Sequence, residues 1–209
     1  MIIVTGANGK LGRAVVERLL RLVPAERVGV SVRDLEKARE LKERGVRVRR
    51  GDFDNAVSLT HAFEGVSQVL IVSSASLGET AVRQHRTAID IARKAGAHRS
   101  LYTSHMGSSP TSPFPPMVDH AATEALLRDS GVAFTAFRNG FYADSALMML
   151  GNALKTGELV APEDGPVAWT THPDLAEVAA ITLSEEVLDG VTPNLTASES
   201  IDLDGIAAF

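Results

Sequence analysis

The 209-residue chain contains no cysteine, which excludes a disulfide framework, a thiolate metal site and a cysteine nucleophile. It also lacks an apolar stretch long enough to span a membrane, and no signal peptide precedes the first predicted strand. We therefore expect a cytoplasmic protein with no membrane partner. The net charge of −5 disfavours a general nucleic-acid surface, so we expect no nucleic-acid partner.

The residues that are present have the composition of an ordinary globular domain, with 44% hydrophobic and 22% charged residues. Apolar runs alternate with helical patterns, which predicts an α/β fold with a parallel, doubly wound sheet and helices on both faces. The predicted strands are Ile2–Thr5, Arg27–Val32, Val46–Arg49, Gln68–Val72, Ser100–Thr103 and Ala133–Phe137, with a weaker one at Val167–Trp169 and another after Asn194. The predicted helices are Lys10–Leu22, Leu35–Arg44, Ala56–Phe63, Thr80–Ala95, Val118–Asp129, Asp144–Lys155 and Leu175–Leu183.

The first dozen residues are the most informative part of the chain. The apolar strand Ile2–Thr5 runs directly into Gly6-x-x-Gly9-x-x-Gly12, which opens an amphipathic helix. Gly6 permits a tight turn, Gly9 leaves room for a phosphate group, and Gly12 lets helix and strand approach closely. Free N–H groups at a helix start attract an anion. The segment predicts a dinucleotide-binding loop, and a plain glycine turn is the alternative.

The end of the second predicted strand indicates which dinucleotide is bound. An NAD-specific site usually places Asp or Glu there, whereas this strand ends in Val32-Arg33-Asp34. A guanidinium at this position suits a 2′-phosphate through bidentate contacts, so Arg33 favours NADP(H), with NAD(H) as a second possibility. The alternative is that Arg33 is solvated. Asp34 also fits as the N-cap of the next helix.

Two later blocks extend the pattern along the chain. Leu101-Tyr102-Thr103-Ser104 precedes His120-x-x-Thr123-Glu124, and both precede Thr135-x-x-Arg138-Asn139-Gly140-Phe141-Tyr142. In this order and spacing, the blocks and the glycine loop resemble the NmrA-like atypical short-chain dehydrogenase/reductases, in particular the NADPH-dependent quinone oxidoreductase type. Family members usually continue for several dozen more residues. We therefore expect a more open substrate pocket or one completed by a partner subunit, which leaves a homo-oligomer possible.

The resemblance implies an NAD(P)-binding Rossmann domain at residues 1–140 and short substrate-lobe elements at residues 141–209, packed as one structural unit. It implies that Asp52 and Phe53 flank the adenine and that the loop from Arg138 to Phe141 surrounds the nicotinamide. The predicted cofactor-binding residues are Gly6, Asn8, Gly9, Lys10, Leu11, Gly12, Arg33, Asp52, Phe53, Ser73, Ser74, Ala75, Thr103, Arg138, Asn139, Gly140 and Phe141. Three of these residues could have a structural role instead: Asp52 in an ordinary turn, Thr103 as a cap of the following loop and Arg138 in an ion pair.

The catalytic pair of typical short-chain dehydrogenases, Tyr-x-x-x-Lys, is absent, because Met106 follows Tyr102 at that spacing and Ala146 follows Tyr142. A quinone accepts hydride readily, and its developing oxygen is weakly basic, so water or a nearby imidazole could supply the proton. We predict His120 as the preferred acid, with Ser104 and Tyr142 as the other catalytic residues. The lesser acid candidates are His105 and His85.

Structural roles compete with each of these catalytic predictions. His120 could cap its helix or face solvent, Ser104 could cap the loop that follows its strand, and His85 could pack against the rim of the site. Tyr142 and Phe141 could stack on an aromatic substrate, with Met148 and Met149 over the pocket, or all four could belong to the core. No pair of the six histidines has the spacing of a helical metal site, so we predict no metal.

Three functions fit these observations. The first is an NAD(P)H-dependent oxidoreductase that transfers hydride to quinones or similar flat aromatic acceptors. The second is a non-catalytic dinucleotide sensor that reports redox state to a protein partner, which the missing catalytic pair favours. The third is a tailoring enzyme for an aromatic natural product, acting as a reductase or as an oxygenase without metal or flavin.

Overall fold

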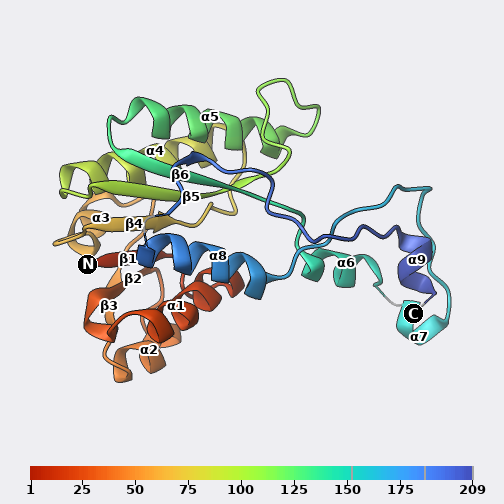
Figure 1. The fold of residues 1–209 in the computed structure, drawn as a ribbon, viewed down its shortest axis with the longest axis horizontal. Helices are drawn as coiled ribbons and strands as arrows, with labels where there is room; N and C mark the ends of the chain where they lie inside the picture. Colours follow the sequence, from red (N-terminus) through yellow and green to blue (C-terminus); the bar gives the residue numbers. More distant parts are fainter. Residues whose placement is uncertain (152, 186, 209) are drawn as a thin grey trace.

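The structure, a computed structural model, describes residues 1–151, 153–185 and 187–208. Within these residues, seven parallel strands form one sheet in the order β3-β2-β1-β4-β5-β6-β7 (Figure 1). The strands are β1 (Ile2–Thr5), β2 (Val28–Val32), β3 (Arg47–Arg50), β4 (Gln68–Ile71), β5 (Arg99–His105), β6 (Ala133–Asn139) and β7 (Gly190–Val191). This order reverses between β1 and β4, where α/β sheets of this type bind ligands at the carboxyl ends of their strands.

Helices cover both faces of the sheet (Figure 1). One face carries α1 (Lys10–Leu22), α2 (Arg39–Glu43) and α8 (His172–Glu185), and the other carries α3 (Ala56–Ala62), α4 (Gly78–Lys94) and α5 (Pro115–Asp129). Successive residues of a strand point to opposite faces, so Ile2 and Val4 enter the first core while Ile3 enters the second. Burial on both faces explains why the central strand β1 is apolar from Ile2 to Val4. None of the helices in the described residues is long and apolar enough to cross a membrane.

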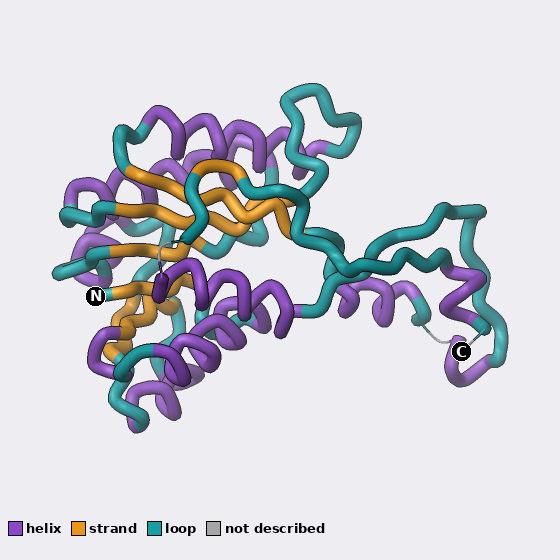
Figure 2. The backbone as a smooth tube through the Cα atoms, viewed as in Figure 1, coloured by secondary structure: helices purple, strands orange, loops and turns teal. Residues whose placement is uncertain are grey.

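Beyond the carboxyl ends of the strands, the chain builds an extension whose described residues are 143–151, 153–169 and 196–208 (Figures 1 and 2). It contains α6 (Ala143–Met149), α7 (Ala153–Thr156) and α9 (Leu203–Ala207), and an antiparallel bridge joins Val167 to Ile201. Met148 and Met149 of α6 are 81% and 56% exposed, so they do not belong to the core. Between the two parts of the extension, the chain returns to the sheet as α8 and β7.

The predicted α/β fold is confirmed. The predicted ends of strands and helices agree best with the structure where the sequence pattern is strongest. The first strand and the first helix match residue for residue, whereas β5 and β6 end two residues later than predicted. The helix predicted over 35–44 is a short 3₁₀ turn, η2 (Glu36–Ala38), followed by α2, and a second such turn, η1 (Ala25–Arg27), precedes β2. The strand predicted at 167–169 is wrong, since only a single bridge forms there.

Candidate functional site

The glycine loop between β1 and α1 is an open anion site. Gly6 has φ +65, a conformation that other residues rarely adopt, and a Cβ on Gly12 would lie 2.5 Å from the carbonyl oxygen of Gly6. Gly9 caps α1 without a side chain. Among the described residues, the amides of Lys10 and Leu11 find no acceptor, as is usual for the first turn of a helix. A diphosphate therefore fits this loop.

At the end of β2, the Arg33 side chain is exposed and forms no ion pair with any described residue. Its neighbour Asp34 is used locally, because its Oδ1 accepts the amide of Glu36 at 3.0 Å and its carbonyl accepts Asn8 Nδ2 at 2.7 Å. The second contact ties the strand end to the glycine loop. Among the described residues, Arg33 is thus an exposed cation without an ion pair at this end of the sheet. Asp34 accepts the amide of the first residue of η2, but the N-cap of that turn is Leu35, one residue after the N-cap predicted at Asp34.

The end of β3 forms a tight turn beside α4. Asp52 Oδ1 accepts the amide of Asp54 at 3.1 Å, and the ring of Phe53 meets the edge of the His85 ring at 6.4 Å between centroids. Gln84, a buried residue of α4, donates to Asp54 Oδ2 at 2.7 Å. These contacts hold Phe53 at the sheet edge, and the adenine contacts of Asp52 and Phe53 stay a prediction.

The loop after β4 is positioned by groups from β5 and α4. The amide of Ser73 donates to Thr103 Oγ1 at 2.8 Å, and the amide of Ser74 donates to His85 Nε2 at 2.9 Å. The Ser74 hydroxyl has no partner among the described residues, and Ala75 is exposed. Thr103 therefore supports this loop, and the cofactor contacts of Ser73, Ser74, Ala75 and Thr103 stay predictions.

His85 has no free nitrogen for acid–base work. Its Nδ1 lies 2.9 Å from Thr123 Oγ1, whose own hydroxyl donates to the carbonyl of Asp119, and its Nε2 accepts the Ser74 amide. Burial, followed by the charge of His120, lowers the pKa of His85 to about 4. The ring is neutral, with its hydrogen on Nδ1, and it supports the β4 loop.

Tyr102 and His120 form a hydrogen-bonded pair at the end of β5. The two atoms, Tyr102 Oη and His120 Nδ1, are 2.8 Å apart, and the Tyr102 side chain is fully buried. Burial, with a smaller effect of His105, lowers the pKa of His120 to about 4, so this ring is neutral at neutral pH. The ring of His105 lies beside that of His120, with centroids 6.0 Å apart. Sequence reasoning considered Tyr102 only as half of the missing Tyr-x-x-x-Lys pair.

Ser104 belongs to a buried ion-pair network. Its hydroxyl donates to Glu124 Oε1 at 2.6 Å, and Arg138 donates to both carboxylate oxygens at 3.2 and 2.9 Å. Burial alone raises the pKa of Glu124, but the hydrogen bonds from Arg138 and Ser104 outweigh it and hold the pKa below its usual value. Arg138 therefore forms an ion pair, which was the structural alternative to a cofactor contact. A contact between Arg138 and the cofactor stays a prediction, and so does the catalytic role of Ser104.

The loop after β6 crosses the sheet edge and starts the extension. Gly140 passes so close to the chain that a Cβ would lie 2.6 Å from Thr170 Oγ1. The next ring, Phe141, lies edge-on to His105 with centroids 4.6 Å apart and reaches Trp169 at 6.3 Å. Phe141 is 40% exposed, whereas Asn139 before it is buried. Phe141 therefore offers an accessible aromatic face beside two imidazoles.

Tyr142 contacts a third imidazole, that of His172. Its ring lies on His172, with centroids 4.5 Å apart, and packs against the core that contains α1 and α8. Burial raises the pKa of Tyr142. Next to it, Asp144 forms ion pairs with Lys10 and His172, which links α6 to the start of α1. No reacting group is placed next to Tyr142, and its catalytic role stays a prediction.

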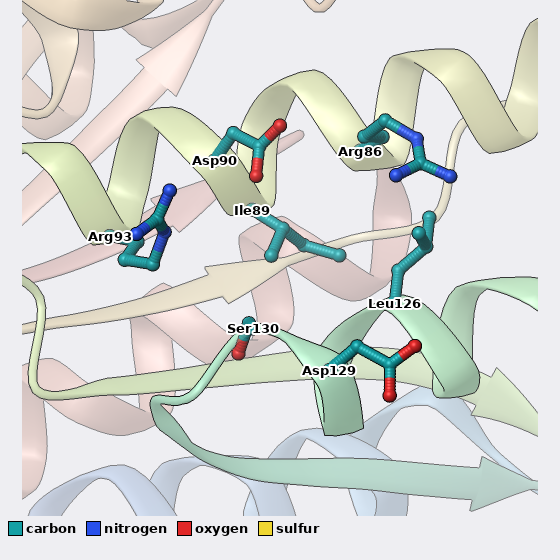
Figure 3. A pocket seen from close by; sticks show the side chains of 7 residues that line it. All are labelled: Arg86, Ile89, Asp90, Arg93, Leu126, Asp129 and Ser130. Atoms are coloured by element: carbon teal, nitrogen blue, oxygen red, sulfur yellow. The ribbon is translucent and has the colours of Figure 1, made fainter.

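A pocket on the helical face of the molecule contains none of the predicted site residues. A groove of about 340 Å³ lies between α4 and α5 (Figure 3). It is lined by Arg86, Ile89, Asp90, Arg93, Leu126, Asp129 and Ser130. In the described parts of the chain, no group of three or more His, Asp or Glu side chains could hold a metal ion. The candidate site is therefore the carboxyl edge of the sheet, from the glycine loop to Phe141.

Comparisons with known proteins show the family to which the chain belongs. A family model described as NAD(P)H-binding matches residues 6–185. The chain is 37% identical to quinone oxidoreductase 2 of Escherichia coli over 209 residues, which is all of this chain and 72% of that protein. It is 31% identical over 204 residues to an NmrA-like family domain-containing oxidoreductase of Aspergillus flavus, covering 95% of this chain and 66% of the relative.

Solved structures show the same relationship. The crystal structure of the NADPH-dependent quinone oxidoreductase of Escherichia coli, complexed with NADPH, superimposes with a TM-score of 0.92 over 100% of this chain and 73% of that one. Triphenylmethane reductase of Citrobacter sp., complexed with NADP(H), gives a TM-score of 0.92 at 35% identity, over 100% and 74% of the two chains. The chain thus spans about seven tenths of the length of these relatives. From its sequence and its fold alike, this chain belongs to the NAD(P)H-binding family as an NmrA-like member.

Proposed function

We propose that this protein is an NADPH-dependent reductase of quinones or similar flat aromatic acceptors. The observation that supports the proposal most is the arrangement along one sheet edge. An anion loop with free amides lies at one end, and an exposed aromatic ring beside two neutral imidazoles lies at the other. Relatives are named as a quinone oxidoreductase and a triphenylmethane reductase, and both names denote acceptors with conjugated rings.

The residues present fit the dinucleotide. The amides at the start of α1 and the cradle between Gly6 and Gly12 would hold its diphosphate, and Arg33, which forms no ion pair with a described residue, would hold a 2′-phosphate. The Ser74 hydroxyl, buried and without a partner among the described residues, lies in the loop after β4, next along the edge. NADPH, when bound, supplies a hydride. The chain itself contributes binding, orientation and donors for the acceptor, since it has no Tyr-x-x-x-Lys pair.

The acceptor end of the site suits a quinone because little acid catalysis is needed. His120 is neutral at neutral pH, since its pKa is about 4, so it acts as a hydrogen-bond donor and water supplies the proton. The oxygen that develops on a reduced quinone is weakly basic and does not need a strong acid. Phe141 provides a flat surface on which the acceptor ring would stack.

The first experiment measures binding and turnover separately. Calorimetry with NADPH should show binding, and NADPH absorbance should fall when tetramethyl-1,4-benzoquinone is added, since this quinone has no free position at which lysines could add. Tight binding without turnover on this and larger aromatic acceptors would contradict the reductase proposal and favour a nucleotide sensor. Absence of binding by well-folded protein would contradict the cofactor site itself.

Cofactor preference is tested with Arg33→Glu. We expect the Kd for NADPH to rise about 10- to 100-fold, because one or two charge-assisted hydrogen bonds to the 2′-phosphate are lost, while the Kd for NADH changes little. The matched control is Arg39→Glu, a charge reversal on the neighbouring α2 at an exposed residue paired with Glu43. Equal changes for both dinucleotides, or an equal effect of the control, would remove Arg33 from the phosphate site.

A further inference from the structure

The contacts around Tyr102 favour one direction for its hydrogen bond with His120. The Tyr102 hydroxyl is fully buried, and a buried donor needs an acceptor. It lies 2.8 Å from His120 Nδ1, whereas the Thr123 hydroxyl, its other polar neighbour, already donates to the Asp119 carbonyl and contacts His85 Nδ1. Burial raises the pKa of Tyr102 far above its usual value, so this side chain keeps its proton. Tyr102 therefore donates, His120 Nδ1 accepts, and the hydrogen of the neutral imidazole is on Nε2.

His105 reaches the same tautomer through a different partner. The backbone amide of Gly107, which can only donate, lies 3.1 Å from His105 Nδ1. This nitrogen is therefore an acceptor too. Burial lowers the pKa of His105, which favours the neutral ring with its hydrogen on Nε2. Two unrelated donors, a tyrosine hydroxyl and a loop amide, thus favour the same tautomer, with hydrogen on Nε2, in two histidines.

The two imidazoles lie together at the acceptor end of the edge. Their centroids are 6.0 Å apart, their planes differ by 28°, and His105 contacts the accessible ring of Phe141. Among the described residues, neither Nε2 atom has a hydrogen-bond partner, although both rings are half-buried. Two neighbouring imidazole N–H groups that have no partner among the described residues, beside an accessible aromatic ring, are suited to bind the oxygen of an aromatic ligand.

We propose that Tyr102 and the Gly107 amide are positioning groups that hold His120 and His105 in the Nε2–H tautomer, so that both rings donate to the oxygen of the acceptor. This inference rests on the proposed function. Negative charge develops on a quinone oxygen when hydride reaches the ring, and fixed donors bind that charge more strongly than they bind the neutral quinone. Their effect therefore falls mainly on kcat.

The proton balance agrees with neutral donors. The quinone gains two electrons and one hydrogen as hydride from NADPH, and solvent supplies the proton that completes the hydroquinone. The two histidines keep their protons, because a proton passed from Tyr102 through His120 would leave a buried tyrosinate. Tyr102 acts through His120 and does not touch the acceptor.

The tautomers are measured directly on the ¹⁵N-labelled chain without cofactor. A long-range ¹H–¹⁵N correlation spectrum distinguishes the two ring nitrogens, and His→Gln variants assign the signals. We expect His120 and His105 to carry hydrogen on Nε2 alone at neutral pH, and Tyr102→Phe to shift the Nδ1 signal of His120 while leaving His105 unchanged. Hydrogen on His120 Nδ1, or an imidazolium at neutral pH, would overturn the proposal.

Kinetics with NADPH and tetramethyl-1,4-benzoquinone test the donor role. His120→Leu, which has no donor, should lower kcat on the order of 100-fold with little change in the Kd for NADPH. His120→Gln places an amide N–H near the position of Nε2 and should restore part of the loss. Tyr102→Phe should lower kcat about three- to tenfold. His61→Gln, at an exposed histidine of α3, is the control with unchanged kcat.

The outcomes separate this inference from the proposed function. A wild-type protein that binds NADPH but does not reduce the quinone overturns the proposed function and the donor role, while the spectrum still decides the tautomers. A Tyr102→Phe protein that folds, with wild-type kcat and an unchanged His120 signal, overturns the positioning role alone. A His120→Leu variant that raises KM with unchanged kcat overturns the donor role for the developing charge.

Discussion

The two ends of the candidate site solve different physical problems. At the phosphate end, around the glycine loop and Arg33, donors are left without partners and side chains are removed by glycine. At the acceptor end, Ser104, Glu124 and Tyr102 pair with other side chains, and the few atoms that stay free, such as His120 Nε2, are oriented by those pairs. Binding at the phosphate end depends on backbone donors left accessible by glycine residues. Binding at the acceptor end depends on side chains that other side chains hold in place by hydrogen bonds.

The largest expected effect comes from adding a side chain to the glycine loop. Gly12→Ala would place a methyl group 2.5 Å from the Gly6 carbonyl, so the loop must shift, and NADPH binding should weaken more than about 100-fold as its amide contacts are lost. Stability should fall by about 1–3 kcal/mol. Gly9→Val is the comparison, because a Cβ there meets nothing closer than 3.4 Å. It should lose binding in calorimetry while its thermal unfolding stays close to wild type.

Binding by Gly9→Val with wild-type affinity would show that the diphosphate lies elsewhere. A stable Gly12→Ala protein with normal binding would show that the close approach of α1 to the loop is not required.

The second effect breaks the completed network. Glu124→Ala leaves Arg138 and Ser104 without their acceptor, and we expect the free energy of unfolding to fall by about 2–3 kcal/mol. The estimate is at the lower end for a buried pair because the Arg138 side chain is 31% exposed. Glu43→Ala, which breaks the exposed pair with Arg39, should cost less than about 1 kcal/mol. Denaturant unfolding measures the loss of stability in both variants. Equal losses for Glu124→Ala and Glu43→Ala would contradict the difference between the buried and the exposed ion pair.

The third effect is the acid sensitivity of the acceptor end. The pKa values of His85 and His120 are lowered to about 4 from 6.5, so the unfolded chain binds protons that the folded chain does not. Stability from these two rings is present above pH 6.5 and is lost as the pH falls from 6.5 towards 4, by up to about 3 kcal/mol for each ring. The carboxylates lose their contribution only near and below pH 4.5, so the range from 4.5 to 6.5 isolates the histidines.

Denaturant unfolding at several pH values checks this acid sensitivity. His120→Gln should flatten the slope between pH 4.5 and 6.5, whereas His61→Gln should leave it as in wild type. A slope that is the same in all three proteins would contradict burial as the cause.

The smallest effect lies where the two ends meet the extension. Lys10 and Asp144 form an ion pair between α1 and α6, but their side chains are 74% and 36% exposed. Lys10→Ala should therefore change the free energy of unfolding by less than about 1 kcal/mol, and the change should shrink further in high salt. Thermal unfolding at low and high salt measures it. A larger loss that is insensitive to salt would show that the extension is held to the body by this contact.

Most of the fold could be predicted because local patterns carried it. Apolar runs predicted where β1 to β6 lie along the chain, glycine spacing predicted the loop at Gly6, and the amphipathic pattern predicted the extent of α1. Boundaries were least accurate in the extension, where the predicted strand at 167–169 is a single bridge. The two-residue strand β7 carried no pattern long enough to detect.

The glycine loop at the phosphate end could be predicted from the amino acids alone. Its parts, which are a strand, a turn without side chains and the start of a helix, follow one another along the chain. The roles at the acceptor end depend on contacts that only folding creates. Tyr102 meets His120 across 18 positions, Ser104 meets Glu124 across 20, and Lys10 meets Asp144 across 134. Which imidazole is free, which is used for support and which carboxylate is paired follows from how strands and helices cross in space, and no local spacing records it.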